Sequence, residues 1–467
     1  MKTPARDMTT GSVLSRLLSL AGPVVLANLL QTAYQFIDTV WVGRVGPTAV
    51  AAVSLSFPIL FLMISLGGGL AIAGTILVAQ YQGRRDSARV NLVAGQTLLA
   101  MLWAASLVSL LGYLISGPII SLMVRNADAD LISQATIYLQ WTFIALPTLF
   151  IFAVFQSLMR GVGDVVTPLY IVGSTVLLNL VLDPFFIFTL DMGVAGAAVA
   201  TLCTQSLAAL AGIWLLFTGR AGIQLSFANL KPRWDLLRRM FFLGLPASIE
   251  QSSRALGITM MAFLVADYPT SVVAAYGVGS RVLGFVIIPA LGLSMAASTM
   301  VGQNLGANRP ERAAEAVKLA GWSGFLVLTA IGGLTYLGSD AIAAFFIPDS
   351  GPVISQAGVF LRIVGLSFGC IGVQQVLNGA FRGSGNTMIS MILSILSLWV
   401  FQFPVAYVLS DRTPLAEIGI WWSYPIANVV AMLVALLWFS HGSWREKKLL
   451  DEVDLVQEET MVEFSTS

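Results

Sequence analysis

The sequence predicts an all-α integral membrane protein of twelve transmembrane helices, arranged as two parallel six-helix lobes. Composition gives the broad class: 57% of the 467 residues are hydrophobic and only 10% are charged, against about a quarter in soluble domains. The mean hydropathy of +0.84 agrees with this. Apolar runs long enough to cross a bilayer recur along the chain. Motifs of the first half return in the second half, which indicates an internal repeat.

Apolar runs of roughly 20 residues, the length that crosses a bilayer as a helix, define the expected spans. Their approximate positions are 15–42, 50–80, 91–115, 131–157, 165–190, 193–217, 236–265, 272–302, 314–338, 353–380, 387–409 and 417–440. Several exceed a perpendicular crossing, which indicates tilt or kinks. Because proline removes a helix hydrogen bond, we expect hinges at Pro23 and Pro184.

The placement of basic residues predicts the orientation. If the N-terminus is cytoplasmic, the outside loops contain only Arg44, Arg125 and Arg412, whereas the inside segments contain most of the 25 lysines and arginines. The positive-inside rule then puts both termini in the cytoplasm. The net charge of +1 gives no reason to expect a nucleic-acid partner. The expected parts are a cytoplasmic N-terminus at 1–14, an N-lobe at 15–219, a cytoplasmic linker at 220–235, a C-lobe at 236–440 and an acidic cytoplasmic tail at 441–467.

Two loop motifs repeat in one register. The segment VAQYQG at 78–83 returns as VGQNLG at 301–306, and RGVGD at 160–164 returns as RGSGN at 382–386. Because an even number of spans separates the copies, the second lobe has the same orientation as the first. Parallel repeats of this kind place a cavity between two lobes.

These features and several motifs together resemble one known family. The motifs are QTAYQFIDT at 31–39, VAA at 50–52, the turn at 80–83 with its repeat, RGVGD at 160–164 and NLVLDP at 179–184. Nearly the whole chain resembles the multidrug and toxic compound extrusion (MATE) transporters, in particular their prokaryotic DinF-type branch. The resemblance implies a V-shaped MATE fold that exports small amphipathic or cationic drug-like compounds by antiport against protons or sodium. We expect a multi-pass monomer in a prokaryotic inner (cytoplasmic) membrane, with the lipid bilayer as its surroundings.

Two acids lie inside expected spans of the first lobe. An ionisable group in a bilayer is costly and therefore marks a functional site by default. Asp38 lies in the first span, and Asp183 lies in the fifth, four residues after Asn179 and so on the same helix face. Their distances from the cytoplasmic ends of these spans put both acids in the outer half of the N-lobe. Gln31 and Tyr34 share the helix stripe of Asp38.

The family resemblance adds further polar residues to this site. Thr201 and Tyr138 match positions of the polar N-lobe site in DinF-type proteins. Gln156 is placed in the same substrate-binding or polar network as Gln31 and Tyr34.

The paired acids are suited to binding the coupling ion. Burial favours the neutral form of a carboxyl group, and a second carboxylate nearby strengthens that preference, so the pair can load a proton near neutral pH. The oxygens of Asp38, Asn179, Asp183 and Thr201 would also suit a hard cation such as Na⁺. The sequence does not decide between the two ions, although we favour the proton. No cofactor is expected beside the coupling ion.

Glu250 is open to two interpretations. It precedes Arg254 by four residues in the seventh span, and a pair of opposite charge on one helix neutralises a buried acid. Alternatively, Glu250 resembles an acid that NorM-type relatives place in a C-lobe cation site. The tenth span offers Gln374, Gln375 and Asn378 but no second carboxylate for such a site.

Other functions have less support. The chain has no Gly-x-x-x-x-Gly-Lys-Ser/Thr loop and no His-Glu-x-x-His motif, so an enzyme is not expected. The first alternative is a flippase for lipids or lipid-linked precursors in the same superfamily, whose cavity should be more cationic. A major facilitator, a channel or a receptor is less favoured by duplicated lobes with acids in only one. The two acids could also serve only to hold helices together by hydrogen bonds.

Overall fold

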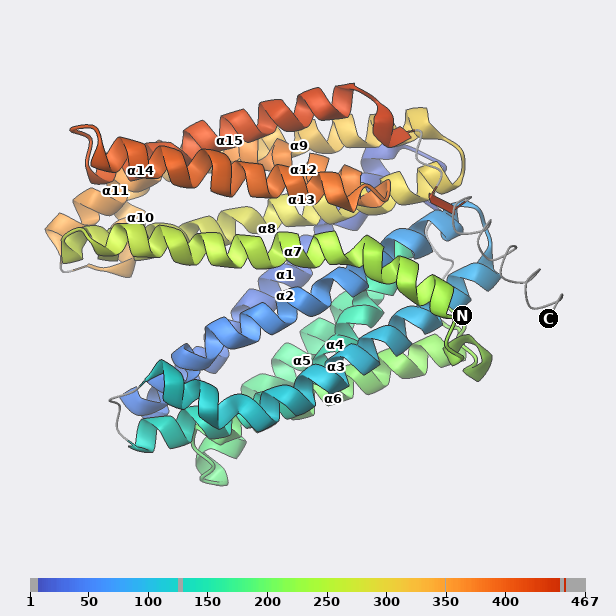
Figure 1. Cartoon of the computed structure of the whole chain (residues 1–467), viewed down its shortest axis with the longest axis horizontal. Coiled ribbons are helices and arrows are strands. Elements are labelled where there is room, and N and C mark those ends of the chain that lie inside the picture. Colours follow the sequence, from blue (N-terminus) through green and yellow to red (C-terminus); the bar gives the residue numbers. More distant parts are fainter. Residues whose placement is uncertain (1–6, 125–128, 349, 446–448, 451–467) are drawn as a thin grey trace. The chain divides into compact units, whose positions relative to one another are not determined.

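The computed structural model describes residues 7–124, 129–348, 350–445 and 449–450. Within these residues the regular structure is helical throughout. The first half contains α1 Val13–Val45, α2 Pro47–Gly83, α3 Ser87–Met123, α4 Ala129–Gly161, α5 Val166–Pro184, the π-helical turn η1 Phe185–Thr189 and α6 Val194–Thr218 (Figure 1). Most of the expected acidic tail, and the first six residues of the expected N-terminal segment, lie outside the described residues.

A short 3₁₀ turn, η2 Phe227–Leu230, connects the two halves. The second half contains α7 Trp234–Ala266, α8 Thr270–Gly306, α9 Pro310–Leu337, α10 Ser339–Phe346, α11 Gly351–Gly365, α12 Phe368–Gly383, α13 Thr387–Ile395, the π-helical segment η3 Leu396–Gln402, α14 Phe403–Asp411, α15 Glu417–Ser440 and the turn η4 Ser443–Arg445. The helical membrane fold that the sequence predicts is therefore confirmed.

Ten helical segments of the described chain are long and apolar enough to cross a membrane, and the pair α11 and α12 adds an eleventh if it is one span. The helix α7, with 33 residues, is long enough to cross. It lacks sufficient hydropathy because its middle reads Glu250-Gln-Ser-Ser-Arg254. The count of twelve spans therefore stays a prediction that depends on α7 and on α11 and α12 forming one span.

Contacts divide the chain into two compact units. Apart from short terminal pieces, unit 1 consists of residues 26–248, and unit 2 consists of residues 8–25 and 249–449. Two helices therefore change unit along their length: α1 does so after Val25 and α7 after Ser248. In each, the change comes just after a proline inside the helix, Pro23 in α1 and Pro246 in α7.

The loop repeats have the same backbone in both units. Arg85 after α2 and Asn308 after α8 are both left-handed, with φ of 62° and 56°. The next residue in each loop donates its amide to an equivalent carbonyl, Asp86 to Tyr81 at 3.1 Å and Arg309 to Asn304 at 2.8 Å. The glycines after α4 and α12 likewise match, with φ of 85° and 86°. The repeat seen in the sequence is therefore a repeat of three-dimensional structure.

Small residues allow the helices within each unit to approach closely, which is typical of membrane bundles. A Cβ atom added to Gly372 of α12 would lie 2.6 Å from the carbonyl oxygen of Gly324 in α9. Hydroxyl groups also cross between helices: Thr75 of α2 donates to the Ser157 carbonyl of α4 at 3.0 Å. Close packing and interhelical hydrogen bonds thus fix the positions of the site-bearing helices.

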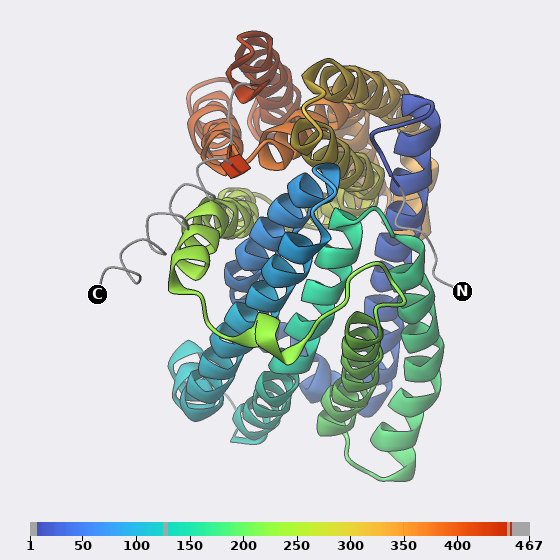
Figure 2. The same cartoon turned by 90° about the vertical axis from the view of Figure 1, so that its right-hand side faces the viewer.

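The connection between the halves is tied to unit 1 by one side chain. The Gln96 amide of α3 donates to the carbonyls of Asn229 and Lys231, both at 2.8 Å. Its oxygen accepts from the Arg233 amide at 2.8 Å. Figure 2 shows this connection, with η2, running across the ends of unit 1 helices.

Helix irregularities fall partly where the sequence predicts them. The π-helical turn Phe185–Thr189 follows Pro184 directly, at an expected kink. The tenth expected span, 353–380, is in contrast divided at Leu366 and Ser367, where α11 and α12 meet at a bend of 52°. No proline lies at this break, although Gly365 directly precedes it, and the sequence analysis did not predict it.

Candidate functional site

The expected acid and amide of α5 form a buried pair in unit 1. Both Asn179 and Asp183 are fully buried. The Asn179 amide nitrogen donates to Asp183 Oδ1 at 2.8 Å, as the four-residue spacing predicts. Asp183 lies one residue before Pro184, where the α-helix passes into the π-helical turn. The acid is therefore held at an irregular point of its helix.

Asp38 of α1 completes an acidic cluster with this pair. Its carboxyl group is near enough to interact electrostatically with that of Asp183. Three buried oxygens have no hydrogen-bond partner among the described residues: Asp38 Oδ1, Asp183 Oδ2 and Asn179 Oδ1. Buried polar atoms are normally satisfied. This cluster is therefore incomplete in a way that a proton or a small cation could correct.

Two tyrosines and a threonine border the acids. The Tyr34 hydroxyl donates to Thr201 Oγ1 at 2.8 Å, joining α1 to α6. Tyr138 of α4 lies near Asp38 and Tyr34 and packs against an apolar cluster around Val42 and Ile187. The structure thus brings together residues from α1, α4, α5 and α6, and the first lobe supplies all of them.

Three further polar residues lie at this site or were expected there. Thr204, which the sequence analysis missed, is fully buried and donates to the Thr201 carbonyl at 3.0 Å. The sequence feature that could have predicted Thr204 is its position on α6, three residues after Thr201 and so on the same helix face. Gln31 is exposed and Gln156 is half-buried. No hydrogen bond from either glutamine to the acids is found in the described chain, so their role in the network stays a prediction.

Glu250 of unit 2 is in a different environment. It is fully buried, and Arg254 Nη2 lies 3.5 Å from its Oε1. The structure adds a second ion pair, because Arg382 of α12 contacts both carboxylate oxygens. Ser390 and Ser394 of α13 also donate to them, at 3.0 and 2.8 Å. Glu250 is thus fully hydrogen-bonded, in contrast to the acids of unit 1.

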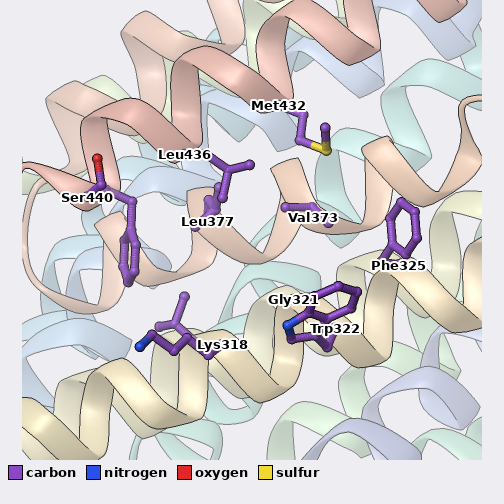
Figure 3. Close-up of a pocket in the computed structure, with 11 residues that line it drawn as sticks. Lys318, Gly321, Trp322, Phe325, Val373, Leu377, Met432, Leu436 and Ser440 are labelled. Atoms are coloured by element: carbon purple, nitrogen blue, oxygen red, sulfur yellow. The ribbon is translucent and has the colours of Figure 1, made fainter.

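Unit 2 also has a mostly apolar pocket of about 410 Å³ between α9, α12 and α15. Figure 3 shows the Lys318 amine and the Ser440 hydroxyl toward one end, and Trp322, Phe325 and Met432 toward the other. No carboxylate lines it. The pocket therefore offers no site for a coupling ion.

The described residues contain no group of three or more His, Cys, Asp and Glu side chains that could hold a metal ion. The acidic cluster of unit 1 has only two carboxylates. A tightly bound multivalent metal is thus a poor match for this site.

Comparison with known proteins shows the same division into halves. A model of the MatE family matches residues 23–185 and again residues 246–408. The chain is 29% identical over 437 residues to the probable multidrug resistance protein YoeA of Bacillus subtilis, covering 91% of this chain and 93% of that protein. It is 30% identical over 456 residues to the probable multidrug resistance protein NorM of Rhodopseudomonas palustris, with 95% and 94% coverage. A crystal structure of a MATE protein in the bent conformation is similar with a TM-score of 0.88 and 26% identity, covering 96% of this chain and 99% of that one.

The Glu250 cluster leads to a stability prediction. We expect Arg382→Gln to lower the free energy of unfolding by on the order of 3 kcal/mol, because it removes the main partner of a buried carboxylate. Thermal unfolding of the purified protein in detergent measures this. The double variant Glu250→Gln with Arg382→Gln should recover most of the loss.

The matched control is Arg85→Gln, which removes a guanidinium from an ion pair with Asp7 whose side chains are 76% and 39% exposed. An exposed pair contributes less than about 1 kcal/mol. If Arg382→Gln destabilised the protein no more than Arg85→Gln, the prediction that Arg382 stabilises the buried Glu250 carboxylate would be wrong.

Proposed function

Because the chain belongs to the MatE family, whose curated relatives include multidrug resistance proteins, we propose that it is a secondary active multidrug exporter. It exchanges amphipathic or cationic organic compounds for protons, or for sodium, by alternating access. The observation that carries the proposal is the acidic cluster of Asp38, Asn179 and Asp183, with three buried oxygens that lack a partner among the described residues. A cluster that needs a positive charge supports cation binding in unit 1.

The coupling ion acts through this cluster. With both carboxyl groups charged, the site attracts a cationic substrate from the cytoplasm. Protonation from outside removes that charge and releases the substrate outward. Each pH unit supplies about 1.4 kcal/mol, and each 100 mV supplies about 2.3 kcal/mol per charge. We favour the proton because a buried pair of carboxyl groups favours holding one proton between them.

Pro23 is the proposed hinge. A proline inside a helix removes one backbone hydrogen bond and so permits bending. The part of α1 before residue 26 belongs to unit 2, and the remainder, with Tyr34 and Asp38, belongs to unit 1. Similar solved structures are of MATE proteins in a bent and in a straight conformation, which supports the proposal that this chain changes conformation. We further propose that the chain is a monomer of the inner membrane with both termini in the cytoplasm.

The acids are tested by dye efflux from cells. We expect Asp38→Asn and Asp183→Asn each to reduce efflux to the level of cells without the transporter, because an amide cannot take up and release the coupling proton. The control is Asp191→Asn. Asp191 is exposed in the loop before α6, and its backbone is left-handed, a conformation that asparagine tolerates. Undiminished efflux in both acid variants, at equal expression, would refute the proposed site.

The coupling ion is tested in inverted membrane vesicles at a fixed membrane potential. An acidic lumen should drive drug uptake without sodium, because substrate entering these vesicles is exchanged for protons leaving them. Uptake that needs a sodium gradient and ignores the pH gradient would replace the proton by sodium, while the acid variants would still define the site.

The hinge is tested by Pro23→Ala, which restores the missing helix hydrogen bond. We expect efflux to fall several-fold while substrate binding to the purified protein is retained. Pro58→Ala is the matched control, since Pro58 is also inside a long apolar helix but lies wholly within unit 1. Equal effects of the two substitutions on efflux would contradict the hinge.

A further inference from the structure

Unit 2 contains a polar cavity that the proposed export cycle does not use. It has a volume of about 300 Å³ and is lined by residues of α7, α8, α12, α13, η3 and α15. Its polar wall includes Arg254, Ser280, Gln374, Gln375, Gln402 and Asn428. Small-molecule sites commonly combine a few such polar groups with apolar walls. Glu250 and Ser394 of the Glu250 cluster also line the cavity, so that cluster forms part of its wall.

The Glu250 cluster in the cavity wall carries an excess of positive charge. Glu250 supplies one negative charge, whereas Arg254 and Arg382 supply two positive charges. Arg382 alone contacts both oxygens of Glu250, so neutralising this acid does not require Arg254. An uncompensated charge inside a membrane helix is costly and indicates function.

The geometry of Arg254 leaves its guanidinium available. Its Nη2 makes two long contacts of 3.5 Å, to Glu250 Oε1 and to Gln375 Oε1, and its side chain is 28% exposed. A guanidinium has five N–H donors in a planar fork that matches a carboxylate or a phosphate. Most of these donors are without an acceptor in the described chain and can face the cavity that Arg254 lines.

The remaining wall is apolar. Ile258 of α7, Leu283 and Ile287 of α8 and Ile371 of α12 line the cavity. A ligand that fits would therefore have an anionic head beside Arg254 and a compact apolar body.

We propose that this cavity is a second binding site, which takes an amphipathic anion whose carboxylate or phosphate group binds Arg254. A cation would meet the excess positive charge and would find Glu250 already paired. The site is separate from the acidic cluster of unit 1 and needs different residues. The proposal therefore goes beyond the proposed function and does not depend on it.

The test is saturable binding of radiolabelled decanoate and of radiolabelled decyl phosphate to the purified full chain in a neutral detergent. We expect one molecule per chain, with no competition from decanol or decyltrimethylammonium. The better of the two anions identifies the head group, a carboxylate or a phosphate ester. Arg254→Gln should weaken binding about tenfold or more, because a charge-assisted hydrogen bond is lost. Arg254→Lys should weaken it less, because the charge remains while the planar fork is lost.

Three features keep the result interpretable. In Arg254→Gln the buried Glu250 still has Arg382, Ser390 and Ser394 as partners, so the fold should persist. Arg281→Gln removes the same charge from α8 at an exposed residue that does not line the cavity, and it should change the affinity less than about twofold, because Arg281 does not contact the bound anion. Asp38→Asn should bind the anions normally even if it abolishes export.

Three results would overturn the second site. One is the absence of saturable binding of either anion. Another is binding that Arg254→Gln leaves unchanged. The third is displacement of the bound anion by decyltrimethylammonium.

Discussion

The cost of placing a charged group in a membrane is the constraint on which the polar architecture of this protein depends. A buried ion must be paired, neutralised or used, because the surrounding hydrocarbon offers no solvation. In unit 2, two arginines form ion pairs with Glu250 and two serines donate hydrogen bonds to it, which offsets the cost of its burial. In unit 1, Asp38 and Asp183 have a single amide between them. The positive charge that arginines supply to Glu250 in unit 2 must therefore come from a bound ion in unit 1. For this reason the acidic cluster suits a transported ion.

The two units differ in side chains while their backbones repeat. Helices α2 and α8 have the same length of 37 residues, and the loops after them share left-handed residues and the same hydrogen bonds. In a bilayer the backbone groups must be satisfied within the chain, which restricts how a helix or its terminal turn can vary. Side chains that face the interior of a unit are not restricted in this way. A repeated fold can thus carry acids in one unit and excess positive charge in the other.

How much the sequence predicts depends on the separation of the interacting residues. Hydropathy and loop motifs predict the spans and the repeat because those signals are local, and the spacing of Asn179 and Asp183 predicts their hydrogen bond through helix geometry alone. The pair of Glu250 and Arg382, 132 residues apart, depends on how α7 packs against α12. The break between α11 and α12 also depends on packing, because no proline lies at the break or within three residues of it. Ser367 instead accepts a hydrogen bond from Asn428 of α15 at 2.9 Å.

The repeat also explains why Arg382 reaches Glu250. Its counterpart in unit 1, Arg160, donates to Ser157 Oγ at 2.7 Å within its own helix. In unit 2 the position matching Ser157 is Gly379, which has no hydroxyl group to accept that bond. A side chain cannot be added there, because a Cβ atom on Gly379 would lie only 2.2 Å from the backbone carbonyl oxygen of Ser294 in α8. The close approach of α8 and α12 therefore removes the local acceptor, directs the Arg382 guanidinium to Glu250 and leaves Arg254 with spare donors beside the cavity.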